Sequence, residues 1–250
     1  MKLKGLVAII TGAGRNIGQD TAVLFAAEGA KVAVVDMDQA AGDRVAAQIT
    51  ANGGDACGFV ANVSDEGDVQ RLIQNIIVKW GRVDILINNA AITDNKTILD
   101  ISKDEWDKVM AVTLTGSFLV AKYAAIQMVE QGWGGAIVNV ASTSGFFGRP
   151  RAIAYSAAKG GIVNLTRAMA VQLGPYNIRV NCVVPNKIGS PVGKQDFDPS
   201  RPVLNLRGRT GLPVDMAKAL LFLVSDDSDF VVGNALFVDG GTSVMLPGGI

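Results

Sequence analysis

Tyr155 and Lys159 are the pair of residues whose types and spacing most directly suggest chemistry. They stand four positions apart in the segment 145–174, which is mostly alanine and small residues, has no proline from 152 to 173 and predicts one long helix with both side chains on one face. A phenol has a pKa of about 10, too high for a base near neutrality, and a neighbouring ammonium favours the phenolate. Because the chain contains no histidine, this pair is a candidate proton-transfer unit. The same pattern also fits a buried tyrosine beside a solvated lysine.

A second candidate site is the glycine-rich stretch 12–18, GAGRNIG, between a strand expected over Leu6–Thr11 and a helix expected over Asp20–Glu28. Backbone N–H groups at a helix start bind anions, and glycines let a phosphate approach closely. The next expected strand ends in Asp36, at the place where a carboxylate accepts hydrogen bonds from the adenosine ribose of a dinucleotide. A tight β–α turn also needs glycine for structural reasons alone.

Composition excludes several classes of function. Lys+Arg and Asp+Glu both number 23 among 250 residues, so the charge balance does not indicate nucleic acid or a membrane surface as a partner. We see no apolar run of membrane-spanning length, and the short apolar run before the glycines is read as a strand rather than a signal peptide, which favours a cytoplasmic location. Cys57 and Cys182 are expected to be small buried residues rather than a disulfide, and no metal site is expected.

Strand and helix patterns alternate along the whole chain, and 49% apolar residues with a mean hydropathy of +0.30 are typical of strands buried on both faces. We therefore predict one α/β domain over residues 1–250, a Rossmann-like, doubly wound parallel sheet of about seven strands with helices on both faces. The expected strands and helices beyond those already named are 31–36, 56–61, 83–88, 135–141, 178–184 and 235–238, and 66–80, 104–130 and 213–223. The irregular stretch 185–210 follows a strand end and is predicted to be a substrate-binding lid.

These motifs together resemble the short-chain dehydrogenase/reductase family over nearly the whole chain. The residues that carry the resemblance are Thr11-Gly12, Asn88-Asn89-Ala90, Ser142, Tyr155, Lys159, Pro185 with Ile188 and Ser190, and Val238-Asp239-Gly240-Gly241. The resemblance implies a nicotinamide dinucleotide at the strand ends and hydride transfer between it and an alcohol or carbonyl. The cofactor-binding residues that it implies are Gly12, Arg15, Asn16, Ile17, Gly18, Asp36, Asn62, Val63, Asn89, Ala90, Tyr155, Lys159, Pro185, Ile188 and Ser190.

The resemblance also implies catalytic roles. Tyr155 is expected to act as general base on an alcohol and, with its phenol protonated, as general acid on a carbonyl. Lys159 is expected to hold the nicotinamide ribose and to lower the pKa of Tyr155. Ser142 is expected to hydrogen-bond the substrate oxygen, although a strand-end serine can also simply cap the local backbone.

Five positions depart from the family pattern. Asn16 replaces a glycine of the loop, and we expect the turn to survive because asparagine tolerates positive φ. Thr113 occupies the place of the asparagine that completes the catalytic tetrad. It keeps the main-chain carbonyl but loses the amide that holds the local helix kink, so an altered proton relay is expected. The remaining three are Asn62 in place of the aspartate that contacts adenine, Ala91 ending the Asn-Asn-Ala turn, and Asn186 after Pro185.

Two residues bear on the choice of cofactor. Asp36 disfavours a 2′-phosphate, whereas Arg15 stands where a basic residue helps to bind NADP. Since Met37 and Asp38 follow Asp36 and supply no positive charge, we predict NAD.

The expected substrate is a small-molecule secondary alcohol or ketone. The presumed pocket also carries aromatic and basic residues that would suit an acidic group, although scattered arginines are often simply solvated. These pocket residues are Thr93, Asp94, Phe146, Phe147, Arg149, Arg151, Lys187, Lys194, Phe197 and Arg201.

The long helices 104–130 and 145–174 carry small and apolar residues that favour a homodimer or homotetramer, with the tail 244–250 as a further contact. Two alternatives stay open at this stage: a cofactor-binding protein with little turnover that acts as a sensor or partner subunit, and dehydration or epimerisation on the same scaffold.

Overall fold

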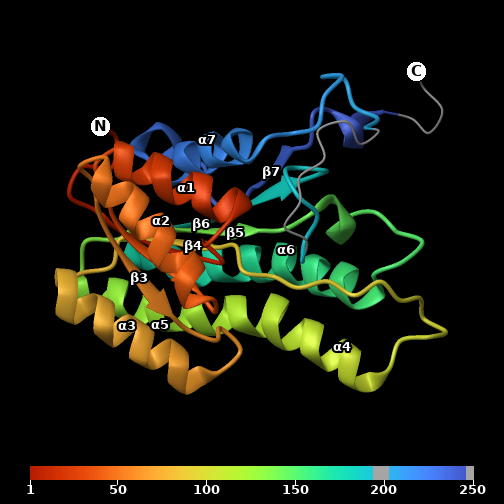
Figure 1. Ribbon diagram of the computed structural model, residues 1–250, viewed down its shortest axis with the longest axis horizontal. Helices are drawn as coiled ribbons and strands as arrows, with labels where there is room; N and C mark the ends of the chain where they lie inside the picture. The colour runs from red at the N-terminus through yellow and green to blue at the C-terminus, as the bar shows by residue number, and fades with distance from the viewer. Residues whose placement is uncertain (194–202, 246–250) are drawn as a thin grey trace.

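The computed structural model describes residues 1–193 and 203–245, and within them it contains one sheet flanked by helices (Figure 1). The strands are β1 (Val7–Thr11), β2 (Lys31–Asp36), β3 (Asp55–Val60), β4 (Ile85–Asn88), β5 (Gly135–Val140), β6 (Ile178–Pro185) and β7 (Ala235–Val238). The helices are α1 (Asn16–Ala27), α2 (Gln39–Ala51), α3 (Glu66–Trp80), α4 (Lys103–Met110), α5 (Gly116–Gln131), α6 (Ile153–Leu173) and α7 (Pro213–Val224). A π-helical turn, η1 (Ala111–Thr115), joins α4 to α5.

All seven strands are parallel, in the order β3-β2-β1-β4-β5-β6-β7. The order reverses direction between β1 and β4, which is the point where open α/β sheets bind their ligands. Because the strands are parallel, the loops after β1, β4, β5 and β6 meet at one edge of the sheet. The predicted fold class is confirmed.

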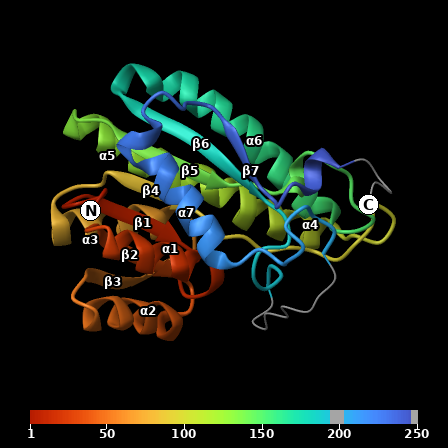
Figure 2. The same ribbon diagram turned by 90° about the horizontal axis from the view of Figure 1, so that it is seen from above.

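Helices cover both faces of the sheet (Figure 2). The inward residues of α1, α2 and α7 pack with Ala8 and Ile10 of β1 in one core, and those of α3, α5 and α6 pack with Val7 and Ile9 in the other. Successive side chains of a strand point to opposite faces, so β1 contributes to both cores and all five of its residues are buried. This double burial explains the continuous apolar runs in the sequence.

The predicted elements agree with the structure to within a few residues, with three differences. The helix predicted over 145–174 begins only at Ile153, after Ala152 in the left-handed conformation. No element was predicted over α2, although Asp38 caps this helix by accepting a hydrogen bond from the Ala41 N–H. The predicted single helix 104–130 is interrupted by η1, where the hydrogen-bond pattern widens for one turn. Both cysteines are free thiols, as predicted; Cys182 is buried, whereas Cys57 on β3 is only partly buried.

One expectation from the sequence needs correction. The continuous helical segment Lys103–Gln131 is long and apolar enough, by length and composition, to cross a membrane. Half of its most apolar window is buried inside the protein, where α5 packs against the sheet. A core helix has these properties, so the segment gives only weak support for a membrane span.

Candidate active site

Ser142 and Tyr155 face one another at the edge of the sheet. Ser142 follows β5, and Tyr155 lies in the first turn of α6. Both are buried, and the Ser142 hydroxyl lies close enough to the phenol to lower its pKa. Ser142 also accepts a hydrogen bond from the Ser144 N–H at 3.1 Å, so it caps the local backbone as well. The structure therefore brings the two residues together, and the capping role coexists with this contact.

The phenol of Tyr155 is protonated at neutral pH in the protein alone. Burial raises its pKa above the usual value, and this effect outweighs the hydrogen bond from Ser142 and the charge of Arg149, which both lower it. A neutral phenol is a proton donor, which suits protonation of a carbonyl oxygen.

Lys159 lies on the same face of α6, with Nζ 5.6 Å from the centre of the Tyr155 ring. Its Nζ donates to the Val140 carbonyl at 2.5 Å, and its complete burial lowers its pKa to about 7. The Lys159 side chain is therefore desolvated and directed to a main-chain carbonyl. The expectation that Lys159 lowers the pKa of Tyr155 stays a prediction.

The burial of Lys159 predicts a pH-dependent stability. Between about pH 7 and pH 10 the unfolded chain binds a proton on this lysine that the folded chain does not, so protonation favours unfolding and stability rises with pH. Relative to the Lys159→Met variant, the wild type should gain roughly 1 kcal/mol of unfolding free energy per pH unit in this window. Urea unfolding of both proteins across the window measures the difference, with the exposed Lys79→Met as control. Parallel pH curves for Lys159→Met and wild type would contradict the assignment.

Thr113 lies in η1 and is completely buried. Its hydroxyl donates to the Ile92 carbonyl at 3.0 Å and accepts from the Ile92 N–H at 3.1 Å. The expectation that the helix kink loses its side-chain support is therefore wrong, because one hydroxyl makes both bonds. The Thr113 carbonyl accepts from the Ser117 hydroxyl at 3.1 Å. The altered proton relay stays a prediction.

Removing the Thr113 hydroxyl should be costly. The Thr113→Val variant keeps the shape but leaves both polar groups of Ile92 without this partner, and we expect a loss of about 2–4 kcal/mol in unfolding free energy. Thr113→Ser keeps the hydroxyl and should lose no more than about 1 kcal/mol. Urea unfolding at one pH compares the two. Equal losses would show that the methyl group, rather than the hydroxyl, stabilises this turn.

The glycine loop has the conformation that a phosphate cradle needs. Gly12 and Asn16 have φ of +62° and +52°, which confirms that asparagine can adopt the left-handed conformation here. A Cβ on Gly18 would lie 2.2 Å from the Gly12 carbonyl oxygen, so only glycine fits. The Asn16 side chain donates to the Ser190 carbonyl at 3.1 Å, which ties the loop to the segment after β6. Ile17 packs against the first core cluster.

Asn89 and Ala90 hold the loop from the neighbouring strand. The Asn89 side chain donates to the carbonyls of Thr11 and Gly12, at 2.9 and 3.0 Å, and the N–H groups of Asn89 and Ala90 donate to the Thr11 hydroxyl. These hydrogen bonds therefore hold the start of the glycine loop, after β1, against the turn after β4.

Asp36 lies at the end of β2, beside this loop. Its carboxylate accepts from the Gly14 N–H at 2.9 Å and from the Asp38 N–H at 3.1 Å. Arg15 is exposed. The sequence reasoning missed Arg44 on α2, whose guanidinium donates to the Gly14 carbonyl at 2.6 Å, because α2 itself was not predicted. The signal that could have located α2 is Asp38, an N-cap residue whose carboxylate accepts from the N–H of Ala41 three residues later.

The remaining predicted cofactor residues lie along the same edge. The Asn62 side-chain oxygen accepts from Ser64, which leaves the Nδ2–H donors for a base. Val63 is buried against Gly116, so its side chain is a packing residue. Pro185 ends β6, and the buried residues Ile188 and Ser190 follow it.

The predicted lid is described only in part. A cavity of about 230 Å³ lies at its base, between Asn186 and Ile188 on one side and Val238 to Gly241 on the other. Phe146 packs against Phe237, with ring centres 4.9 Å apart, while Phe147 is exposed. Lys194, Phe197 and Arg201 lie outside the described residues, as does most of the apolar tail 244–250.

Several of the predicted pocket residues have structural partners. Arg151 donates to the Asn95 carbonyl, and Asp94 accepts from the backbone of Tyr155. Arg149 donates to the Ser144 hydroxyl, and its charge reaches Tyr155.

The seven-stranded parallel sheet with a glycine loop after β1 is a Rossmann-like α/β fold. A family model described as enoyl-(acyl carrier protein) reductase matches residues 12–243. A 3-oxoacyl-[acyl-carrier-protein] reductase of Thermotoga maritima is 36% identical over 96% of this chain and 99% of its own. A 2-(S)-hydroxypropyl-CoM dehydrogenase of Xanthobacter autotrophicus is 40% identical over 98% and 99%, and a cyclopentanol dehydrogenase of Comamonas is 38% identical over 94% and 96%.

The structure of a short-chain type dehydrogenase/reductase from Mycobacterium marinum superposes with a TM-score of 0.89 at 32% identity, over 98% of this chain and 97% of that one. The chain belongs to the short-chain dehydrogenase/reductase family, and it is similar to oxidoreductases along its whole length.

Proposed function

We propose that the protein is an NAD-dependent dehydrogenase or reductase that interconverts a secondary alcohol and a ketone. The observation that carries the proposal is the buried Ser142–Tyr155 contact at the same sheet edge as the glycine loop. The loop fits a dinucleotide, because the Gly18 position excludes any side chain and Asp36 stands beside the loop. When bound, NAD(H) supplies or accepts the hydride.

The protein's own residues manage the proton. During reduction, the Tyr155 phenol donates its proton to the substrate oxygen while the Ser142 hydroxyl hydrogen-bonds the same oxygen and stabilises its developing charge. During oxidation, the same phenol oxygen, once deprotonated, removes the proton of the alcohol. Because burial keeps the phenol protonated, we expect reduction to proceed near neutrality and oxidation to require higher pH.

Asp36 supports NAD over NADP, since its carboxylate stands beside the glycine loop where a 2′-phosphate would meet a negative charge. Arg15 and Arg44 provide nearby positive charge, but Arg44 is bonded to the Gly14 carbonyl. The sensor alternative is less favoured because Ser142, Tyr155 and Lys159 are all buried together at one edge, an arrangement that cofactor binding alone does not require.

We also propose a cytoplasmic homodimer or homotetramer. The exposed apolar side chains Phe118 and Ile126 on α5 and Val171 on α6 support association through these two helices.

The test is the rate of nicotinamide oxidation with NADH and a panel of cyclopentanone, an acyclic methyl ketone and a 3-oxoacyl thioester. The proposal predicts turnover of at least one ketone with NADH. Turnover of none of them, by a protein that is folded and binds NADH, would favour the sensor alternative.

A further inference from the structure

The first turn of α6, which carries Tyr155, has no capping residue of its own. The residue before the helix is Ala152, which has φ +69° and no side chain that can accept a hydrogen bond. The first N–H groups of a helix have no partner inside it, and Ser, Thr, Asp or Asn normally supplies one. The residue that carries the proposed proton donor therefore depends on another part of the chain for its backbone partner.

Asp94 supplies that partner from 61 positions earlier in the sequence. Its Oδ1 accepts from the Tyr155 N–H at 3.0 Å, and its Oδ2 accepts from the Lys96 N–H at 3.3 Å. One carboxylate thus connects the backbone of Tyr155 to the loop after β4.

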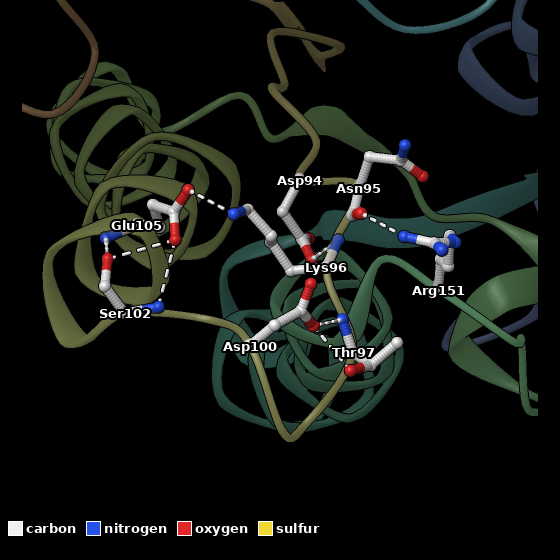
Figure 3. A network of polar contacts seen from close by, with 8 residues as sticks. All are labelled: Asp94, Asn95, Lys96, Thr97, Asp100, Ser102, Glu105 and Arg151. Atoms are coloured by element: carbon white, nitrogen blue, oxygen red, sulfur yellow. Dashed lines mark hydrogen bonds and ion pairs between the residues drawn. The ribbon is translucent and has the colours of Figure 1, made fainter.

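The segment 92–97, which we call the strap, is fastened to the start of α6 by further contacts (Figure 3). The Lys96 carbonyl accepts from the Ala152 N–H at 2.9 Å, and the Asn95 carbonyl accepts from Arg151 at 3.2 Å. The first of these bonds holds Ala152, whose left-handed conformation costs roughly 1–2 kcal/mol in an L-residue.

The strap is also bonded to η1 and to α4. Thr113 in η1 makes both of its side-chain hydrogen bonds to the backbone of Ile92, two residues before Asp94. Lys96 forms an ion pair with Glu105 of α4 at 3.4 Å (Figure 3). The strap therefore joins η1 and α4 to the first turn of α6.

We propose that Asp94 is a positioning residue for Tyr155, and that it acts by capping the first turn of α6 so that the phenol stays against Ser142. This proposal rests on the proton-transfer function proposed above. It assigns Asp94 to the alignment of the proton donor rather than to substrate binding.

The test compares Asp94→Ala, which removes the acceptor, with Asp94→Asn, whose side-chain oxygen can accept the same N–H. Asp100→Ala is the control for a general loosening of the strap, because the Asp100 carboxylate accepts from the N–H and the hydroxyl of Thr97, the last residue of the strap (Figure 3). It removes a carboxylate that holds the strap and leaves the cap on Tyr155 in place. Hydrogen exchange of the Tyr155 amide reports the cap directly. We expect exchange about tenfold faster in Asp94→Ala, near the wild-type rate in Asp94→Asn, and unchanged in Asp100→Ala.

Two further readouts distinguish positioning from stability. The chain has three tyrosines, so the NMR signal of an isotope-labelled tyrosine Cζ can be assigned to Tyr155 by its loss in Tyr155→Phe. In Asp94→Ala this signal should shift, because the phenol moves relative to the buried surroundings that raise its pKa and to Ser142 and Arg149, which lower it. With a ketone that is turned over, kcat should fall about tenfold while KM for NADH stays within about twofold.

The amide exchange and the Cζ signal require no turnover, so they decide the proposal even if no hydride transfer is found. The proposal is overturned if Asp94→Ala leaves both signals at their wild-type values. It is equally overturned if Asp94→Asn fails to restore them, or if Asp100→Ala changes them as much.

Discussion

Tyr155→Phe is expected to lower kcat for ketone reduction by about 10³-fold while the protein still binds NADH. The substitution removes one oxygen atom, which is the proton donor in the proposed reaction, and leaves the ring to fill the same buried space. Because the glycine loop, Asp36 and Asn89 are untouched, NADH should raise the thermal midpoint of the variant as much as that of the wild type.

The control for this prediction is Tyr176→Phe, which changes an exposed tyrosine after α6. This variant should retain wild-type turnover. If Tyr155→Phe keeps more than about a tenth of the wild-type kcat, Tyr155 is not the principal proton donor.

Asp36→Asn is expected to shift the preference from NADH toward NADPH by roughly tenfold to a few hundredfold. Two unit charges about 4 Å apart interact with about 1 kcal/mol in water and about 4 kcal/mol at an effective dielectric constant of about 20, and the variant removes this repulsion from the 2′-phosphate. The asparagine oxygen can still accept the Gly14 N–H, so the loop should keep its shape. Dissociation constants for NADH and NADPH, measured by titration, give the ratio.

Asp38→Asn is the matched control, because it removes a neighbouring carboxylate and keeps an acceptor for the cap of α2. Its ratio should stay close to that of the wild type. An unchanged ratio in Asp36→Asn, or a wild-type preference for NADPH, would mean that Arg15 and Arg44 determine the cofactor.

The sheet could be predicted from the sequence because its central strands β1, β4 and β5 are buried on both faces and leave continuous apolar runs. The position of the candidate site could be predicted for the same reason. The glycine loop follows β1 and Ser142 follows β5, and Tyr155 lies in the first turn of α6, the helix after β5. The helix α2 was missed because its sequence, QAAGDRVAAQITA, alternates small and polar residues with a glycine near its start.

The features that the sequence did not predict depend on contacts between distant residues. The π-helical turn at Thr113 is held by Ile92, and the cap on Tyr155 comes from Asp94. The Lys159 side chain is completely buried and donates to the Val140 carbonyl. The type of this residue and its spacing from Tyr155 do not specify either property. Local sequence pattern therefore located the candidate site residues, whereas their orientation depended on tertiary structure.

The most direct test of the proposed reaction is to follow deuterium from labelled NADH into the product. NADH that carries deuterium at the hydride position is mixed with excess protein and a ketone from the panel, and the product is analysed by mass spectrometry and NMR. Hydride transfer predicts an alcohol with deuterium on the former carbonyl carbon, formed by the wild type and nearly abolished in Tyr155→Phe. A product without deuterium, or equal yield from the variant, would contradict NAD-linked hydride transfer with Tyr155 as its proton donor.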